Sequence, residues 1–203
     1  MTLCATTAFV AKDTAFCPAV SHQVSLFAVG NGLGRLAVGQ LSDWTHRRRL
    51  VPRPLWLCGS MLLMAAAHTV LALPFGLPGL YCGMFCVGLS FGAMFTLNVV
   101  ITSELWGVTN HGANYMLFDG TTGIFGTLCL GKYLTQAVYV AGIEAGQPDS
   151  RDCHGRQCFA NTHWIVAGAC AASTLACLTV AWRTRTLYKR IWRGEDLDIP
   201  AWP

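Results

Sequence analysis

Charged residues are scarce in this sequence. Asp, Glu, Lys and Arg make up 12% of its 203 residues, whereas a soluble domain usually carries about 25%. Hydrophobic residues make up 53%, and the mean hydropathy is +0.44. A soluble domain of this length keeps a large polar surface and does not need so many apolar residues. The composition therefore argues against an ordinary soluble domain and is typical of a membrane protein.

Sequence features that would indicate other classes of protein are also absent. No nucleophile–base set and no metal-ligand cluster lies within the apolar segments, so we expect no enzyme, no cofactor and no metal site there. The formal net charge is only +4, and the basic clusters directly adjoin apolar segments. We therefore expect no nucleic-acid partner.

Five apolar segments approach the roughly 20 residues that a helix needs to cross the hydrocarbon core of a bilayer. They predict an all-α, polytopic membrane helix bundle over residues 22–183, after an N-terminal segment of residues 1–21 and before a tail of residues 184–203. The expected spans are His22–Gln40, Leu55–Leu73, Pro78–Thr102, Ala113–Ala141 and Thr162–Trp182.

Basic residues gather in the loop after the first span and in the C-terminal tail. With five spans these two clusters fall on the same side, and an excess of Lys and Arg marks the cytoplasmic side. We therefore expect a cytoplasmic C-terminus, with the tail as an interfacial helix at an anionic leaflet. The clusters are Arg47, Arg48, Arg49 and Arg53 in the loop, and Arg183, Arg185, Lys189, Arg190 and Arg193 in the tail.

The stretch "GNGLGR" (residues 30–35) has two interpretations. Gly32, Gly34 and Ala37 satisfy the G-x-G-x-x-A form of a dinucleotide-binding turn. That turn requires an acidic residue about 20 positions later, but "VPRPLW" (residues 51–56) contains none. The alternative is close packing of membrane helices through small residues. We favour packing because glycines recur one turn apart, at Gly30 with Gly34 and at Gly88 with Gly92.

The next stretch, "GQLSDWTHRR" (residues 39–48), resembles the loop signature G-x-L-x-D-R-x-G-R-R/K of the major facilitator superfamily. The chain departs from that signature at Trp44, where a basic residue is usual, and at His46, where a glycine is usual. The matching residues are Gly39, Leu41, Asp43, Arg47 and Arg48.

Two later motifs narrow the resemblance to the nodulin-like facilitators. "SELWGVTNHGANYMLF" (residues 103–118) is similar to their S-E-L-F-G-x-x-x-x-G-x-x-Y-N segment, and "CHGRQCF" (residues 153–159) to their C-x-G-x-x-C-F loop. The order of the three motifs implies the C-terminal half of such a transporter, over about residues 24–190. The resemblance implies secondary transport of a small solute by alternating access in a lipid bilayer, with a missing N-terminal half as a partner. The alternative is a truncated or non-transporting membrane protein that needs a partner chain.

Within this framework we expect Asp43 to form a cytoplasmic latch with Arg35, Arg47 and Arg48, at the loop that contains Gly39. Charges inside membrane spans are costly and mark functional candidates. Asp119 and Lys132 lie about 20 Å apart along an ideal helix. One of them is expected to line the translocation path, the alternatives being a near-interface position for Asp119 and snorkelling or bundle pairing for Lys132. Glu104 is expected to be a helix-end contact or gate, and Asn98 a polar cavity residue.

Cys153 and Cys158 occupy a polar loop on the expected non-cytoplasmic side. Three outcomes are open for this pair: a disulfide, a zinc site with His154 and His163, or two free thiols. The non-cytoplasmic location favours the disulfide. The other cysteines in apolar runs are expected to be buried apolar residues.

Overall fold

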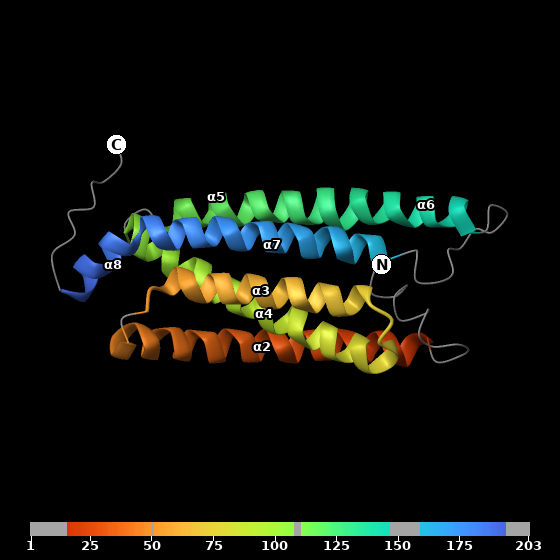
Figure 1. Cartoon of the computed structure of the whole chain (residues 1–203), viewed down its shortest axis with the longest axis horizontal. Coiled ribbons are helices and arrows are strands. Elements are labelled where there is room, and N and C mark those ends of the chain that lie inside the picture. The colour runs from red at the N-terminus through yellow and green to blue at the C-terminus, as the bar shows by residue number, and fades with distance from the viewer. Residues whose placement is uncertain (1–15, 50, 108–110, 147–158, 194–203) are drawn as a thin grey trace.

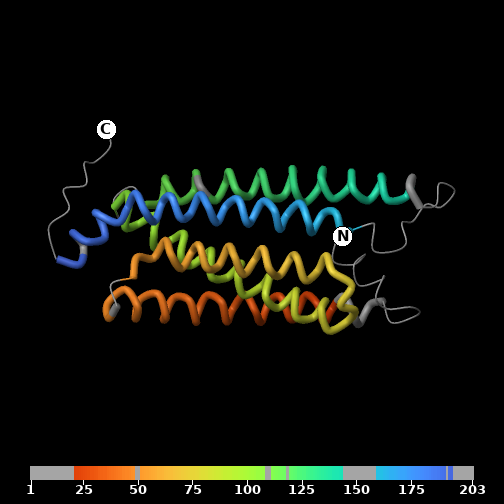
Figure 2. Tube along the Cα trace, viewed as in Figure 1, coloured from red at the N-terminus to blue at the C-terminus, as the bar shows by residue number. Residues whose placement is uncertain are grey.

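The computed structural model describes residues 16–49, 51–107, 111–146 and 159–193, and every regular element in those ranges is a helix. The bundle in Figures 1 and 2 is elongated, and its long helices lie lengthwise beside one another. The all-α prediction is therefore confirmed. The helices are α2 (Phe16–Arg49), α3 (Arg53–Ala72), α4 (Gly76–Trp106), α5 (His111–Ile124), the π-helix η1 (Phe125–Leu134), α6 (Thr135–Gly146), α7 (Ala160–Arg183) and α8 (Arg185–Trp192).

Helices α2 and α4 run in the same direction and touch through their backbones. An ideal Cβ added to Gly34 would lie 2.1 Å from the carbonyl oxygen of Leu89, and one added to Gly92 would lie 2.1 Å from that of Asn31. A Cβ added to Gly30 or Gly88 would likewise collide with backbone atoms of the other helix. The predicted packing role of these four glycines is confirmed. A Cβ at Gly32, in contrast, would meet no atom within 4 Å, so Gly32 takes no part in this contact.

Helix α3 runs antiparallel to α2 and α4, because short turns that contain proline and glycine connect it to each of them. Pro52 is extended before the first residue of α3, and Pro54 lies in the first turn, where a missing N–H costs nothing. After α3, Gly76 begins α4 with φ of 64°, a conformation that side chains with a Cβ rarely adopt. These short turns bring the start of α3 beside the ends of α2 and α4 (Figure 1).

Helix α7 packs antiparallel on the opposite face of α3. Near one end of this interface, the Nδ1 atoms of His68 and His163 lie 3.1 Å apart, at hydrogen-bonding distance. This pairing could not be predicted from the sequence, because it joins residues of two different helices. His163, expected near the cysteine loop, thus contacts α3.

The run α5–η1–α6 is continuous, as Figure 2 shows, and it contacts the rest of the bundle through α4 and α7. Its middle portion, η1, is wound as a π-helix and has no buried residue. Large apolar side chains on this run point outward, including Phe125, which is 69% exposed. Such a face requires lipid or another protein surface to cover it.

Three helices among the described residues are long and apolar enough to cross a membrane: α3, α4 and α7. They correspond to three of the five expected spans, with ends that differ by a few residues. The expected first and fourth spans coincide with α2 and with the run α5–η1–α6, and their crossing of a membrane stays a prediction. Helix α2 begins at Phe16, earlier than the expected start at His22.

Candidate functional site

Helices α2, α3, α4 and α8 come together at one end of the bundle, which we call the loop end. Helix α2 ends there, α3 begins, α4 ends and α8 lies at the same end of the bundle (Figure 1). Contacts from α8 to both α2 and α4 place the C-terminal tail on the same side of the bundle as the first loop, as the five-span arrangement predicts. That this side is cytoplasmic stays a prediction.

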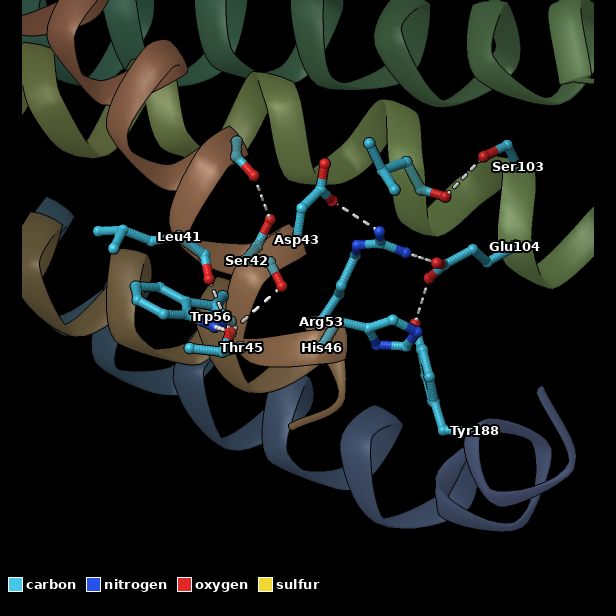
Figure 3. A network of polar contacts seen from close by, with 12 residues as sticks. Leu41, Ser42, Asp43, Thr45, His46, Arg53, Trp56, Ser103, Glu104 and Tyr188 are labelled. Carbon is cyan, nitrogen blue, oxygen red and sulfur yellow. Dashed lines mark hydrogen bonds and ion pairs between the residues drawn. The ribbon is translucent and has the colours of Figure 1, made fainter. Parts of the chain in front are cut away.

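Arg53 is the centre of a polar network at the loop end, shown in Figure 3. Its Nη2 atom lies 2.7 Å from Oδ1 of Asp43 on α2, and its Nη1 atom is paired with Oε1 of Glu104 on α4. The hydroxyl of Tyr188 on α8 donates to the other oxygen of Glu104, Oε2, at 2.8 Å. These four residues form the Arg53 network, which joins α2, α3, α4 and α8.

The two carboxylates of the network differ in environment. The side chain of Arg53 is 13% exposed and that of Glu104 is 15% exposed, so their ion pair is largely removed from water. The side chain of Asp43 is 54% exposed. Because water screens exposed pairs, the bond to Asp43 is expected to contribute about 1 kcal/mol or less, whereas loss of one partner from a buried pair costs about 3–5 kcal/mol. The pair with Glu104 therefore dominates the stability of the network.

Tyr188 completes the network from α8. Its side chain is fully buried, and burial raises the pKa of its hydroxyl to about 12, with the charge of Arg53 acting in the opposite direction. The phenol therefore keeps its proton at neutral pH and donates a hydrogen bond to Glu104. Removing α8 would leave Oε2 of Glu104 without this donor.

His46 forms a second contact between α2 and α8. Its Nδ1 atom accepts a hydrogen bond of 3.4 Å from Nε1–H of Trp192, and its ring meets that of Tyr188 edge-on at 5.8 Å. Burial lowers the pKa of His46, and the charge of Arg53 lowers it further. The imidazole is therefore held neutral, which leaves Nδ1 free to accept.

We expect acidification to loosen α8. The pKa of His46 is lowered while α8 is docked. Above the ordinary value of about 6.5 the imidazole is therefore mostly neutral in both the docked and the undocked form. Below that value the undocked form binds the proton more readily, so docking is lost as pH falls. The charges that act on this imidazole are Arg53 and Arg47, which oppose its protonation, and Asp43, which favours it.

Hydrogen exchange of residues 185–192, corrected for the intrinsic effect of pH, would measure this loosening between about pH 7.5 and about pH 5.5. The variant His46→Gln should abolish the difference. An equal difference in the variant and the unaltered chain would exclude His46 as its cause.

The described contacts of Arg35 are with Asn31 and Phe95 and not with Asp43, its expected partner in the latch. Its Nε atom donates to Oδ1 of Asn31, 3.1 Å away, and its guanidinium lies 5.2 Å from the ring centre of Phe95 on α4. Asp43 instead pairs with Arg53. Gly39 faces Thr96 on α4, and Arg47 and Arg48 are exposed. The latch role of Arg35, Gly39, Arg47 and Arg48 stays a prediction, and the described contacts do not bring these arginines to Asp43.

The other predicted site residues lie apart from the loop end. Asn98 is partly buried on α4, Asp119 is partly buried on α5, and Lys132 is exposed in the π-helix η1. A π-helical segment often marks a functional site, but the role of each of these residues in a translocation path stays a prediction. Cys153 and Cys158, with His154, lie outside the described residues.

Two residues of the network were missed from the sequence, namely Arg53 and Tyr188. In the sequence Arg53 is one of several loop charges, and only the structure places it as the first residue of α3. Tyr188 belongs to the tail that the sequence predicts to be an interfacial helix. Its spacing of four residues from Trp192 puts both rings on one face of a short helix, and that signal could have indicated a docked face.

Comparison with known proteins identifies the family. The sequence profile described as "NFD4, C-terminal domain" matches residues 6–190. This match covers most of the chain, so the chain belongs to the NFD4 C-terminal domain family, and the predicted resemblance to the C-terminal half of nodulin-like facilitators is confirmed.

Relatives named as transporters support the same assignment. The chain is 30% identical to "Probable transporter mch1" of Emericella nidulans and 31% identical to "Probable transporter MCH1" of Yarrowia lipolytica, over 76% and 85% of the chain. It is 27% identical to "Protein NUCLEAR FUSION DEFECTIVE 4" of Arabidopsis thaliana over 83% of the chain. The matches span 28%, 36% and 29% of these three relatives, so the chain corresponds to about a third of their length. No solved structure matches the chain.

Proposed function

We propose that this chain supplies one half of a membrane transporter that moves a small solute by alternating access. In this proposal the Arg53 network is a cytoplasmic latch that holds the helix ends in one of two arrangements. The observation that carries the proposal is the single guanidinium of Arg53 that binds carboxylates of both α2 and α4. Family membership and the names of the relatives support the class of protein.

An ion-pair network suits a latch because its energy depends on exclusion of water. In transporters of this kind, two helical bundles rock about a site near the membrane midplane. While Glu104 and Arg53 are buried, their attraction is strong, and it weakens greatly once water screens the pair. A modest separation of α2 from α4 would thus release the latch, and closure would restore it.

The translocation path is proposed to pass the face shared by α2 and α4. Arg35 stands on this face against Phe95, and Asn98 follows less than one turn later on α4. A cation in the apolar part of a bundle is costly and therefore marks a functional site. We accordingly propose Arg35 and Asn98 as candidates for contact with the solute on this face, and Asp119 and Lys132, on α5 and η1, as separate candidates.

A second half is required in this proposal. The outward apolar face of α5–η1–α6, including Phe125, would be covered by lipid and by that half. The chain spans only about a third of its relatives. The competing proposal, a truncated or non-transporting protein that needs a partner chain, rests on this same coverage.

A chimera separates the two proposals. The region of the Yarrowia lipolytica relative that this chain matches would be replaced by residues 16–193 of this chain. Vesicles containing the intact relative, the chimera or this chain alone would be screened for uptake of labelled carboxylates, amino acids, sugars and metal ions.

We expect the chimera to take up whatever solute the intact relative takes up, and the chain alone to take up none. A chimera that reaches the membrane and folds, yet carries none of the relative's solutes, would favour the non-transporting protein.

A further inference from the structure

Helix α8 has two faces with different chemistry. One face carries Tyr188 and Trp192, which contact Glu104 and His46 at the loop end. The adjoining face carries Arg185 and Lys189, both exposed. Residues four apart lie one above the other on a helix, so the docked aromatic pair and the exposed cationic pair form two neighbouring stripes.

Trp182 lies shortly before α8 and indicates that α8 begins at the membrane boundary. This residue lies one position before the end of the apolar helix α7 and is 65% exposed, and tryptophan is enriched where a membrane meets water. The guanidinium of Arg185 lies 5.2 Å from the centre of the Trp182 ring. The cationic stripe therefore begins at the level where lipid headgroups would lie.

We propose that α8 binds anionic lipid headgroups and that this binding holds Tyr188 against Glu104, so that the charge of the leaflet controls the Arg53 network. The consequence of this control for transport rests on the proposed function of the Arg53 network as a latch. Three exposed cations, Arg183, Arg185 and Lys189, complement a negative leaflet surface. Each basic residue near such a surface strengthens membrane binding about fivefold. A soluble polyanion would have to approach the same stripe against the bilayer surface, which favours the lipid as partner.

The coupling passes through one carboxylate. Arg53 holds Oε1 of Glu104, and Tyr188 holds Oε2. If α8 leaves, water reaches the side of Glu104 that the fully buried Tyr188 had covered. Screening by that water weakens the remaining ion pair. The charge of the lipid would thus alter the contact between the ends of α2 and α4 without the lipid touching either helix end.

Hydrogen exchange of the 203-residue chain in lipid nanodiscs tests the proposal. The nanodiscs would contain phosphatidylcholine with or without phosphatidylserine. We expect phosphatidylserine to slow exchange of α8 and also of residues 41–49 at the end of α2. The double variant Arg185→Gln with Lys189→Gln should lose about 25-fold in the lipid-dependent protection, whereas the charge-conserving variant Arg185→Lys with Lys189→Arg should keep it. Salt at about 1 M should remove the effect.

The variant Tyr188→Phe separates lipid binding from coupling. It keeps the buried ring and lacks the hydroxyl, so α8 should still respond to phosphatidylserine while residues 41–49 should not. An unaltered chain with equal α8 exchange in both lipids would overturn the lipid site. A response of α8 without one at residues 41–49 would overturn the coupling. Neither result depends on uptake, so failure of the transport proposal in the chimera would be recognised separately.

Discussion

Replacement of Arg53 by glutamine is expected to loosen the loop end more than any other single change there. Glu104 would lose its buried partner and Asp43 its exposed one. A broken buried pair costs about 3–5 kcal/mol, and an exposed pair about 1 kcal/mol or less. We therefore expect a loss of about 3 kcal/mol in local stability, measured by hydrogen exchange of residues 41–49 and 101–106.

The two carboxylates provide an internal comparison. Glu104→Gln should cost clearly more than Asp43→Asn, because the side chain of Glu104 is shielded from water and that of Asp43 is not. Arg35→Gln should leave exchange at the loop end unchanged, since its side chain bonds Asn31 within α2. If Arg35→Gln loosened the loop end as much as Arg53→Gln, Arg53 would not be the centre of the network.

Substitution of Gly34 is expected to have the largest effect on the bundle itself. A Cβ at this position would lie 2.1 Å from the carbonyl oxygen of Leu89, and backbone cannot move aside as a flexible side chain can. Overpacking typically costs about 1–3 kcal/mol and occasionally more. We expect Gly34→Leu to exceed about 3 kcal/mol by separating α2 from α4, and Gly34→Ala to reach the upper part of that range.

Gly32 gives the matched control, since it lies two residues away on the same helix and faces open space. Gly32→Ala should be neutral or should stabilise the helix by about 0.5–1 kcal/mol. Thermal unfolding in detergent micelles, followed by tryptophan fluorescence, would compare the variants. Equal melting temperatures for Gly34→Ala and Gly32→Ala would contradict the backbone contact between α2 and α4.

Much of the fold could be predicted because it depends on local patterns. Long apolar runs located α3, α4 and α7, and the spacing of Gly30 and Gly34 indicated a packed helix face. The π-helical winding of η1 could not be foreseen, because its residues have the same apolar composition as an ordinary helix. The pairing of His68 with His163 depends on how α3 lies against α7, which the sequence of neither helix specifies.

The candidate site was predicted in part for the same reason. Asp43 and Glu104 are both candidates from the sequence, Asp43 because it matches the loop signature and Glu104 because it is a charge at the end of an apolar segment. Their shared partner was missed because Arg47 and Arg48 fill the signature positions close to Asp43 in sequence. Arg53 comes next to Asp43 only once the chain turns at Pro52 into α3, so its role follows from the tertiary turn.

The most direct test of the account is a double-mutant cycle on uptake by the chimera, with Arg53→Gln and Glu104→Gln made singly and together. If the two residues act through one latch, each single variant should change the uptake rate by a similar factor, and the double variant should change it little further. If the two effects multiply as for independent sites, the ion pair between Arg53 and Glu104 is not the latch.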